Sequence, residues 1–422
     1  MPSPQLNHND KATIRLADSS AIRNALTALK PVQNPPWLKP GNSFLNSSSM
    51  SPTFVKNNAA ELIEITAIKG PLHAIDGWSC VGRSLNALIN GDAHGARHLA
   101  YYGELRGALS ILASSGIAVF NRVNAVIDAN GSVHHLAGLP THQICWLALS
   151  EWASSSNRTE DIIATLQIGG MPLLQLARSF FPSGVSIGMQ DLMNAWGFDL
   201  ARGADDRDAR NASSYQPTAL IPIRTNPADD AEFLKDMWGA IRPNEISLER
   251  HLLRIFLERQ AAINNDMISA YKSIHDGWSD SLKSSITFDF LSRTGSNETE
   301  DHPIIKHGTA QQNPAHPYSM ICRATLLLKI ATSLAERNLT LAGLKPREDL
   351  EIWWQEFGEI HGLWSPGSAP GSSQELWDDV FCELEDLETA PTTHRHEWLS
   401  ALKETGVRIC KTERAALWGL FQ

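Results

Sequence analysis

The chain has 422 residues, a length that predicts two or three domains. Hydrophobic residues make up 42% and charged residues 19%, a composition that excludes an intrinsically disordered chain. The 46 acidic against 36 basic residues give a formal charge of -10. This charge argues against binding nucleic acid over the whole surface and leaves room only for a local basic patch.

The cysteines and the apolar runs indicate the compartment. Five cysteines are scattered without a CxxC pair, so neither a disulfide framework nor a structural zinc site is expected. The polar N-terminus lacks the apolar segment of a secretory signal. No apolar run approaches the roughly 18 residues of a membrane span, and Lys329 interrupts the run 324–331. We therefore expect a cytoplasmic protein with no membrane segment.

The first quarter of the chain is expected to pass from a tail into long helices. Prolines and serines suggest that residues 1–55 form a flexible N-terminal tail without regular structure. Residues 61–70 are compatible with a short strand or with the start of a helix, and residues 76–112 carry a long helical pattern. Residues 117–136 resemble a β-hairpin whose turn is Asn130-Gly131.

Small residues follow one face of the helix expected at 92–112. Ala96, Ala100, Gly103 and Gly107 recur at steps of four, three and four, which places them on one side of a helix. Glycine costs a helix about 1 kcal/mol relative to alanine. The pattern therefore predicts that another helix approaches this face closely.

The rest of the chain is predominantly helical in its periodicity. Residues 140–196 predict helices separated by a loop, 217–227 an extended segment, and 229 onward a series of amphipathic helices. Residues 295–312 are expected to form a polar loop. The predicted fold is mainly α with minor β, a multi-helical bundle divided into domains at 56–225 and 226–422.

One short motif carries a functional resemblance. Arg210-Asn211, followed by Tyr215, resembles the Arg-Asn-x-x-x-His signature of HEPN domains, with tyrosine in place of histidine. HEPN domains are helical bundles, commonly dimers, and many are metal-independent RNases of toxin and phage-defence systems. The resemblance covers roughly residues 140–225. The helix around 94–112 is in turn similar to the helical core of YaaC-like relatives. The resemblance implies a HEPN-like core of abortive-infection type.

The resemblance also implies roles for the three motif residues. Arg210 would hold a scissile phosphate with its permanently charged, forked guanidinium, and Asn211 would orient other groups by hydrogen bonds. Tyr215 would occupy the position of the base, but an ordinary tyrosine pKa of about 10 suits that task poorly. Three alternatives remain: a histidine such as His98 moves the proton, the site binds RNA without cutting, or Arg210 pairs with Asp206 across a helical turn.

A second candidate site lies on the helix at 92–112, formed by His94, Arg97, His98, Tyr101 and Arg106. His94 and His98 have the i, i+4 spacing of a metal pair, but Gly95 replaces the glutamate of HExxH. Glu104 would be an awkward third ligand two turns away. The same face would suit a phosphate or a structural hydrogen-bond network. No cofactor is expected, because nucleotide-binding glycine motifs are absent. No metal is expected either, because the HExxH pattern is incomplete and Glu104 is poorly placed.

Arg323 lies in the apolar run after Pro317, which is itself suited to the first turn of a helix. A guanidinium in such surroundings requires a carboxylate or a bound anion. We expect a structural ion pair there.

Three functional hypotheses follow. The first is a helical adaptor or sensor subunit of a bacterial defence or toxin–antitoxin system, which grips RNA or protein partners from the same operon and forms a possible homodimer. The alternative is an active metal-independent endoribonuclease using Arg210, Asn211 and Tyr215. The third is a metal-dependent hydrolase using His94 and His98.

Overall fold

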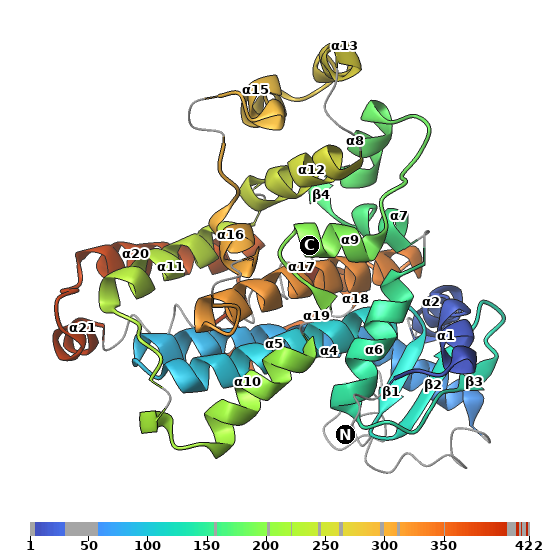
Figure 1. Ribbon diagram of the computed structural model, residues 1–422, viewed down its shortest axis with the longest axis horizontal. Coiled ribbons are helices and arrows are strands. Elements are labelled where there is room, and N and C mark those ends of the chain that lie inside the picture. Colours follow the sequence, from blue (N-terminus) through green and yellow to red (C-terminus); the bar gives the residue numbers. More distant parts are fainter. Residues whose placement is uncertain are drawn as a thin grey trace.

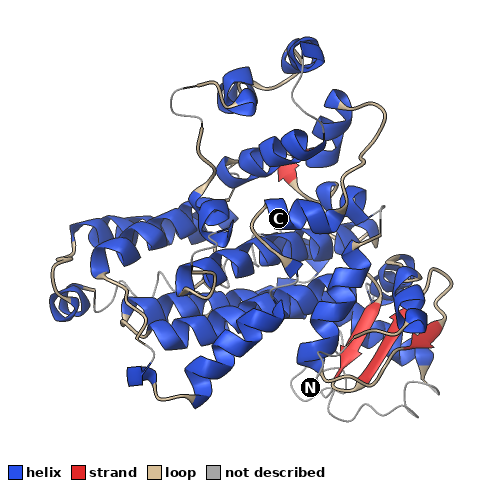
Figure 2. Cartoon of the chain, in the orientation of Figure 1, coloured by secondary structure: helices blue, strands red, loops and turns tan. Residues whose placement is uncertain are grey.

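The computed structural model describes residues 5–29, 58–155, 158–200, 203–220, 222–243, 246–260, 265–295, 299–309, 313–349, 351–402, 411–412, 415 and 419–420. Helices dominate these residues, and the strands form two small antiparallel sheets (Figures 1 and 2). The expectation of a mainly α fold with minor β is confirmed.

The N-terminal half, to residue 220, contains these elements: α1 (His8–Arg15), α2 (Ser20–Leu29), α4 (Ala59–Ile89), α5 (Ala93–Ser114), β1 (Ile117–Phe120), β2 (Val123–Ile127), β3 (Val133–His135), α6 (Thr141–Ala153), α7 (Arg158–Ile163), β4 (Gln167–Ile168), β5 (Met171–Pro172), α8 (Leu173–Phe180), α9 (Met189–Ala195), α10 (Gly203–Tyr215) and a 3-10 turn (Thr218–Leu220).

The C-terminal half is entirely helical within the described residues: α11 (Pro227–Ala240), α12 (Ser247–Gln260), α13 (Asn265–His275), α14 (Asp280–Ser285), α15 (Phe288–Ser292), α16 (Pro303–Thr309), α17 (Pro317–Leu341), α18 (Pro346–Asp349), α19 (Glu351–Ile360), α20 (Ser373–Thr389) and α21 (Arg395–Ala401).

Three long helices, α4, α5 and α17, pack together at the centre (Figure 1). The small-residue face of α5 allows this approach: a Cβ added to Gly103 would lie 3.1 Å from Val81 Cγ2 on α4 and 3.2 Å from Ala324 Cβ on α17. Ala96 and Ala100 are fully buried on the same face. The predicted close approach of another helix is confirmed, and it involves two helices.

The α4–α5 hairpin settles the ambiguity of residues 61–70, which are helical. Pro71 lies inside α4, which continues past it to Ile89. The sequence pattern at 76–112 predicts one helix, but a turn between Ile89 and Ala93 divides it into α4 and α5. The Asp92 side chain in this turn accepts a hydrogen bond from the Gly95 N–H at 2.8 Å. This N-cap begins α5.

The three-stranded sheet lies at one corner of the helical body (Figure 2). The expected hairpin around Asn130-Gly131 joins β2 to β3, with Val126 opposite His134. A further strand, β1, pairs antiparallel with β2 through a turn at Asn121 and Arg122. Both turn residues have positive φ, 29° and 76°, as the tight connection between twisted antiparallel strands requires.

The expectation of a flexible tail is wrong for residues 8–29. They form α1 and α2, whose apolar faces enter the main core; Ile14 and Ile22 are 0% and 1% exposed. Amphipathic spacing outweighs polar composition there, because burial of such side chains contributes about 1.5–3 kcal/mol each. The proline- and serine-rich part of the expected tail, residues 30–57, lies outside the described residues.

The segment 295–312 also differs from expectation, because α16 interrupts the predicted loop and buries Ile304 and Ile305. By contrast, Pro317 occupies the first turn of α17 as predicted, behind a His316 cap. One continuous core includes residues on both sides of the boundary expected at residue 225, since α17 packs against α2, α4 and α5.

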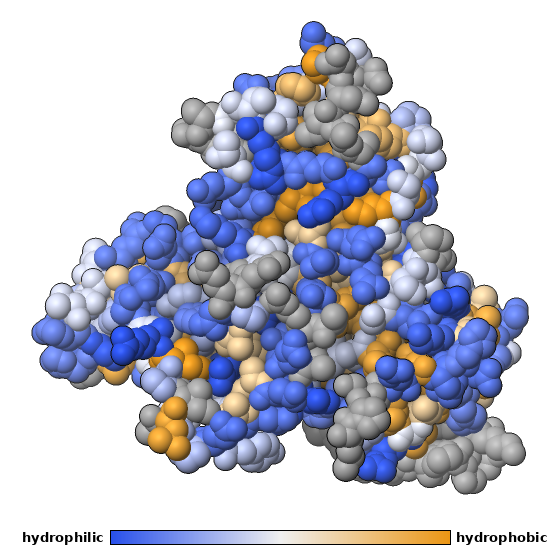
Figure 3. Space-filling model, in the orientation of Figure 1, coloured by the Kyte–Doolittle hydropathy of each residue, from blue (hydrophilic) through white to orange (hydrophobic). Residues whose placement is uncertain are grey.

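The face seen in Figure 3 is mostly hydrophilic, with hydrophobic side chains gathered beneath α12. Within the part of the chain that the structure describes, no helix is both long and apolar enough to cross a membrane.

Candidate functional site: the α5–α10 interface

Helix α10 packs antiparallel against α5 (Figure 1). This contact brings together the two candidate sites that the sequence predicts separately. Ser213 near the end of α10 accepts a hydrogen bond from Arg97 Nε at 2.7 Å, and its hydroxyl also forms a hydrogen bond with His94 Nδ1 at 3.1 Å. Arg210, one turn earlier, meets Tyr101. Residues far apart in the sequence therefore share one polar interface.

Arg210 lies over two aromatic rings. Its guanidinium carbon is 5.3 Å from the centroid of Tyr101 and 5.5 Å from that of Tyr102, distances at which a cation is attracted to the ring face. The residue is 8% exposed, and its Nε has no hydrogen-bond partner. Among the described residues, no carboxylate forms an ion pair with it.

The alternative in which Arg210 pairs with Asp206 is wrong. Asp206 accepts instead from Arg323 of α17 at 2.8 Å, and Arg323 Nε lies 3.3 Å from Glu104 Oε1. All three side chains are at most 4% exposed. The structural ion pair expected for Arg323 is therefore confirmed. It engages Asp206, the acidic residue one helical turn before Arg210.

His98 borders Arg210. Ser214 Oγ lies 2.7 Å from His98 Nδ1 and 3.0 Å from the Arg210 carbonyl oxygen, to which it can donate. In the tautomer that completes both hydrogen bonds, Nδ1 of His98 carries the proton and Nε2 has the free lone pair. Burial, and then the charge of Arg210, lower the pKa of His98 below its ordinary value. The ring is therefore neutral near pH 7.

His142, at the first turn of α6, completes the surroundings of Arg210. Its Nδ1 is 3.0 Å from the Tyr101 hydroxyl, and its ring stacks on Tyr101 at 5.8 Å. Burial lowers the pKa of His142, and the charges of Arg210, Arg207 and Arg106 lower it further. All three charges are positive, so the surroundings of His142 form a locally electropositive region on an acidic protein.

We call Arg210, His98, Tyr101, Tyr102 and His142 the Arg210 cluster. Sequence reasoning missed Tyr102 and His142. Tyr102 is next to a predicted site residue, but the histidine comes from another helix and no spacing within α5 or α10 indicates it.

Three predicted site residues lie elsewhere. Tyr215 is 79% exposed, and Asn211 is a half-buried residue of α10 outside the contacts of Arg210 described above. A residue five positions after Arg210 points about 140° away around a helix, so Tyr215 cannot share its face, whereas Ser214 does. Arg106 donates to His73 Nδ1 at 3.0 Å and lies 3.6 Å from Asp76, on the α4 side of α5.

His94 and His98 do not converge as metal ligands would, because each contacts a different serine of α10. Within the described ranges, no group of three or more histidine, cysteine, aspartate or glutamate side chains is placed to hold a metal ion. The geometry gives the third hypothesis no support.

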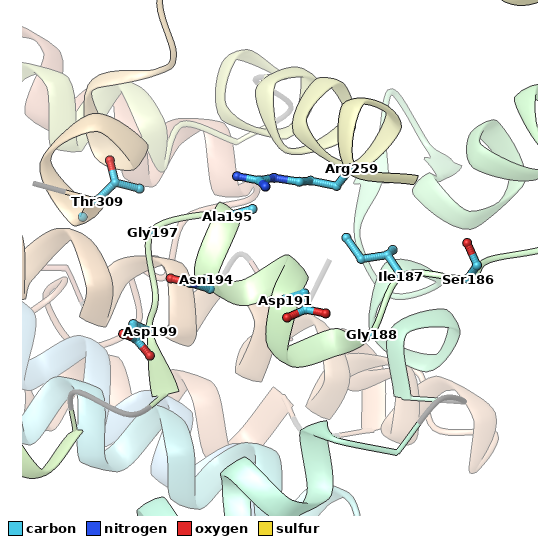
Figure 4. A pocket seen from close by; sticks show the side chains of 11 residues that line it. Ser186, Ile187, Gly188, Asp191, Asn194, Ala195, Gly197, Asp199, Arg259 and Thr309 are labelled. Atoms are coloured by element: carbon cyan, nitrogen blue, oxygen red, sulfur yellow. The ribbon is translucent and has the colours of Figure 1, made fainter. Parts of the chain in front are cut away.

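A cavity of about 760 Å³ lies away from this interface, between α9 and the ends of α12 and α16 (Figure 4). Arg259 reaches across it from α12, and Asp191 and Asn194 line it from α9. Gly197 and Gly308 meet backbone to backbone beside it; a Cβ on Gly308 would lie 3.1 Å from the Gly197 carbonyl oxygen. None of the residues proposed from the sequence lines this cavity.

Comparison with known proteins gives no assignment: no family model, no curated protein and no solved structure matches the chain. The functional argument therefore depends on the chemistry of the chain itself.

Proposed function

We propose that the Arg210 cluster binds a phosphate group of RNA, and that the chain is a HEPN-like RNA-binding or adaptor subunit of a bacterial defence or toxin-type system. The supporting observation is a largely buried arginine whose guanidinium lies over two tyrosine rings without a carboxylate partner among the described residues. A buried cation requires an anion or strong polar contacts. A phosphate would supply the missing charge.

The surroundings of Arg210 favour RNA over a small free anion. Tyr102, His98 and the exposed Ser214 form a rim where a base can stack and a ribose hydroxyl can form hydrogen bonds. Single-stranded RNA is commonly bound by such a combination of aromatic rings and guanidinium groups. The net charge of -10 elsewhere would restrict RNA to this electropositive region.

Fluorescence anisotropy with a labelled single-stranded RNA tests the proposal. Arg210→Gln should weaken binding about tenfold or more, and the slope of log K against log salt should fall by about 0.7, the value for one lost phosphate contact. Arg210→Lys should recover only part of the affinity, because an ammonium lacks the flat fork that stacks on tyrosine.

Arg178→Gln provides the matched control. Arg178 is a surface arginine on α8 that pairs with Glu160 at 3.0 Å, far from α10 in the sequence and in the fold. The proposal fails if Arg178→Gln and Arg210→Gln reduce RNA affinity equally, or if the unaltered protein binds no RNA at low salt.

A second candidate function, metal-independent RNA cleavage, is favoured by the His98 tautomer. His98 Nε2 would accept the proton of a 2'-hydroxyl, the 2'-oxygen would bond to phosphorus, and the 5'-oxygen would leave with a proton from water. The products would be a 2',3'-cyclic phosphate and a 5'-hydroxyl. Arg210 would hold the phosphate while its negative charge increases.

Incubation of RNA with the protein in excess EDTA distinguishes cleavage from binding alone. His98→Gln should abolish the cyclic-phosphate product even at protein concentrations that saturate the RNA, whereas His135→Gln, an exposed position on β3, should change neither cleavage nor RNA affinity. If RNA remains intact with the unaltered protein, the non-catalytic binding proposal stands and the nuclease proposal falls.

The adaptor part of the proposal concerns protein partners. Tyr215 at the end of α10 and Leu220 in the following 3-10 turn are 79% and 77% exposed, and exposed large side chains next to a ligand site favour partner contact. We expect a homodimer or a complex with products of the same operon. Light scattering and a pull-down with Tyr215→Ser and Leu220→Ser variants test this expectation, which a monomeric chain without operon partners would contradict.

A further inference from the structure

The exposed side chains of α5 continue beyond the Arg210 cluster. After the first turn of α5, the positions that reach solvent are His98, Leu99, Tyr102 and Arg106, and the rest of the helix is buried. This spacing puts the four side chains on one helix face. His98 and Tyr102 belong to the Arg210 cluster, so one exposed stripe leads from the cluster to Arg106, a helical turn further on.

Helix α4 presents a second exposed stripe beside α5 (Figure 1). From residue 65 to residue 83, the positions of α4 that reach solvent recur at alternating steps of three and four: Lys69, Leu72, Asp76, Ser79 and Arg83. Such steps again define one face of a helix.

Arg106 joins the two stripes. It donates to His73 Nδ1 of α4 at 3.0 Å and lies 3.6 Å from the Asp76 carboxylate, with 37% of its side chain exposed. Lys69 lies one turn before His73, and its ammonium lies over the Phe120 ring of β1 at 5.7 Å, a contact that favours this position of the cation. The exposed surface therefore continues from α5 to Lys69.

Positive charge predominates on these two stripes. Three cations, Lys69, Arg83 and Arg106, are opposed by one carboxylate, that of Asp76, which is 58% exposed and so screened by water. Burial, and then the charge of Arg106, lower the pKa of Lys69. An anion bound between these two cations would relieve their repulsion.

The length of this surface suits several nucleotides. The steps from Tyr102 to Arg106 on α5 and from His73 to Lys69 on α4 are four residues each, or about 6 Å along a helix axis. Because α4 and α5 are antiparallel neighbours joined by a tight turn, both steps run in the same direction and add to about 12 Å. A stacked strand rises about 3.4 Å per nucleotide, so about four nucleotides cover this distance.

We propose that the surface formed by Tyr102, Arg106 and Lys69 binds single-stranded RNA of about four or more nucleotides, independently of its sequence. The inference rests on the proposed function, because the strand continues from the phosphate that contacts Arg210. Arg106 and Lys69 bind later phosphates of the same strand, and a base stacks on Tyr102 between them. Phosphate contacts and stacking recognise no base edge, so they do not select a sequence.

Fluorescence anisotropy with labelled oligoadenylates of two and eight nucleotides tests the proposal at low salt. The unaltered protein should bind the octamer at least about tenfold more tightly than the dimer. Lys69→Gln and Arg106→Gln should each weaken octamer binding about three- to tenfold, lower its salt slope by about 0.7, and leave the affinity for the dimer unchanged. Arg210→Gln should weaken the binding of both.

The two lengths separate this inference from the proposed function. If dimer and octamer bind equally and both depend on Arg210, the extended surface is refuted and the phosphate contact of Arg210 stands. If the unaltered protein binds neither RNA, the proposed function fails and the extended surface fails with it. Octaglutamate that displaces the octamer as well as unlabelled RNA does would show a surface for acidic protein and overturn the assignment to RNA.

Two further variants are controls. Arg106→Lys keeps the positive charge and should restore most of the octamer affinity that Arg106→Gln loses. Lys272→Gln removes an exposed cation of α13, at the far end of the molecule from α4 and α5 (Figure 1), and should change neither affinity. Melting curves confirm that each variant is folded. An equal loss of octamer binding in Lys272→Gln and Lys69→Gln would contradict a localised surface.

Discussion

At the scale of single residues, Arg323 is a buried charge at the centre of the helical core, with its side chain 1% exposed. It serves two carboxylates at once, Asp206 and Glu104, at the crossing of α5, α10 and α17. Both Glu104 oxygens lack a hydrogen-bond partner, and its pKa is raised by burial and by the Asp206 charge. One cation thus faces two buried acids, and burial beside Asp206 favours the protonated form of Glu104.

Replacing Arg323 should destabilise the protein strongly. Arg323→Gln leaves Asp206 buried without its cation, and breaking a buried ion pair by removing one partner costs about 3–5 kcal/mol. Urea unfolding followed by tryptophan fluorescence measures the change. Lys345→Gln, which removes an exposed cation paired with Glu348, should change the unfolding free energy by less than about 1 kcal/mol; a similar loss in both variants would contradict this prediction.

The raised pKa of Glu104 predicts how stability depends on pH. Between the unfolded and the folded pKa the native state binds more protons than the unfolded state, so the free energy of unfolding decreases as pH rises through that interval. Glu104→Gln keeps the neutral shape and removes the titration. Its unfolding free energy should therefore decrease less between pH 5 and 8 than that of the unaltered protein. Parallel curves for the two proteins would show that Glu104 is charged in the fold.

At the scale of elements, the close packing of α4, α5 and α17 depends on glycine. A Cβ atom at position 103 would lie closer to side-chain carbons of both α4 and α17 than an ordinary van der Waals contact allows. Any larger side chain must therefore displace a neighbouring helix or side chain.

Gly103→Leu should lower the unfolding free energy by about 1–3 kcal/mol through overpacking. Gly239→Ala on α11 is the contrasting change, because a Cβ there would meet nothing within 4 Å. It should raise stability by up to about 1 kcal/mol through helix propensity. Thermal melting of the two variants gives the comparison, and a neutral Gly103→Leu would refute the packing argument.

Sequence reasoning succeeded where the signal is local. The spacing of small residues on α5, the Asn130-Gly131 turn and the need of Arg323 for a carboxylate all follow from a few neighbouring positions. The helices α1 and α2 give a weaker signal: the apolar residues Ile14 and Ile22 are there, but the prolines and serines after residue 30 favour a tail for the whole segment.

The site was only partly predictable, because its neighbours come from distant helices. The motif spacing identified Arg210 but assigned its partner to Tyr215, which helical geometry turns outward. His142 on α6 and Ser213 and Ser214 on α10 are brought to His98 and Arg97 by tertiary packing.

At the scale of the whole molecule, the two halves depend on each other, because α17 fills the groove between α4 and α5. Residues 1–225 expressed alone should therefore expose the α5 face that α17 covers, bind a hydrophobic dye and lack a cooperative melting transition. Co-expression with residues 226–422 should restore the transition. A fragment 1–225 that melts cooperatively by itself would show that this half forms its own core.

The late position of α17 affects how the protein is made. Helix α5 ends at Ser114 and α17 begins only at Pro317. At ribosomal rates of about 5–20 residues per second, the nascent chain waits on the order of tens of seconds before its central helix can be completed. During that interval the glycine-lined surface of α5 is open to chaperones and to other newly made chains, so the yield of folded protein depends on translation speed.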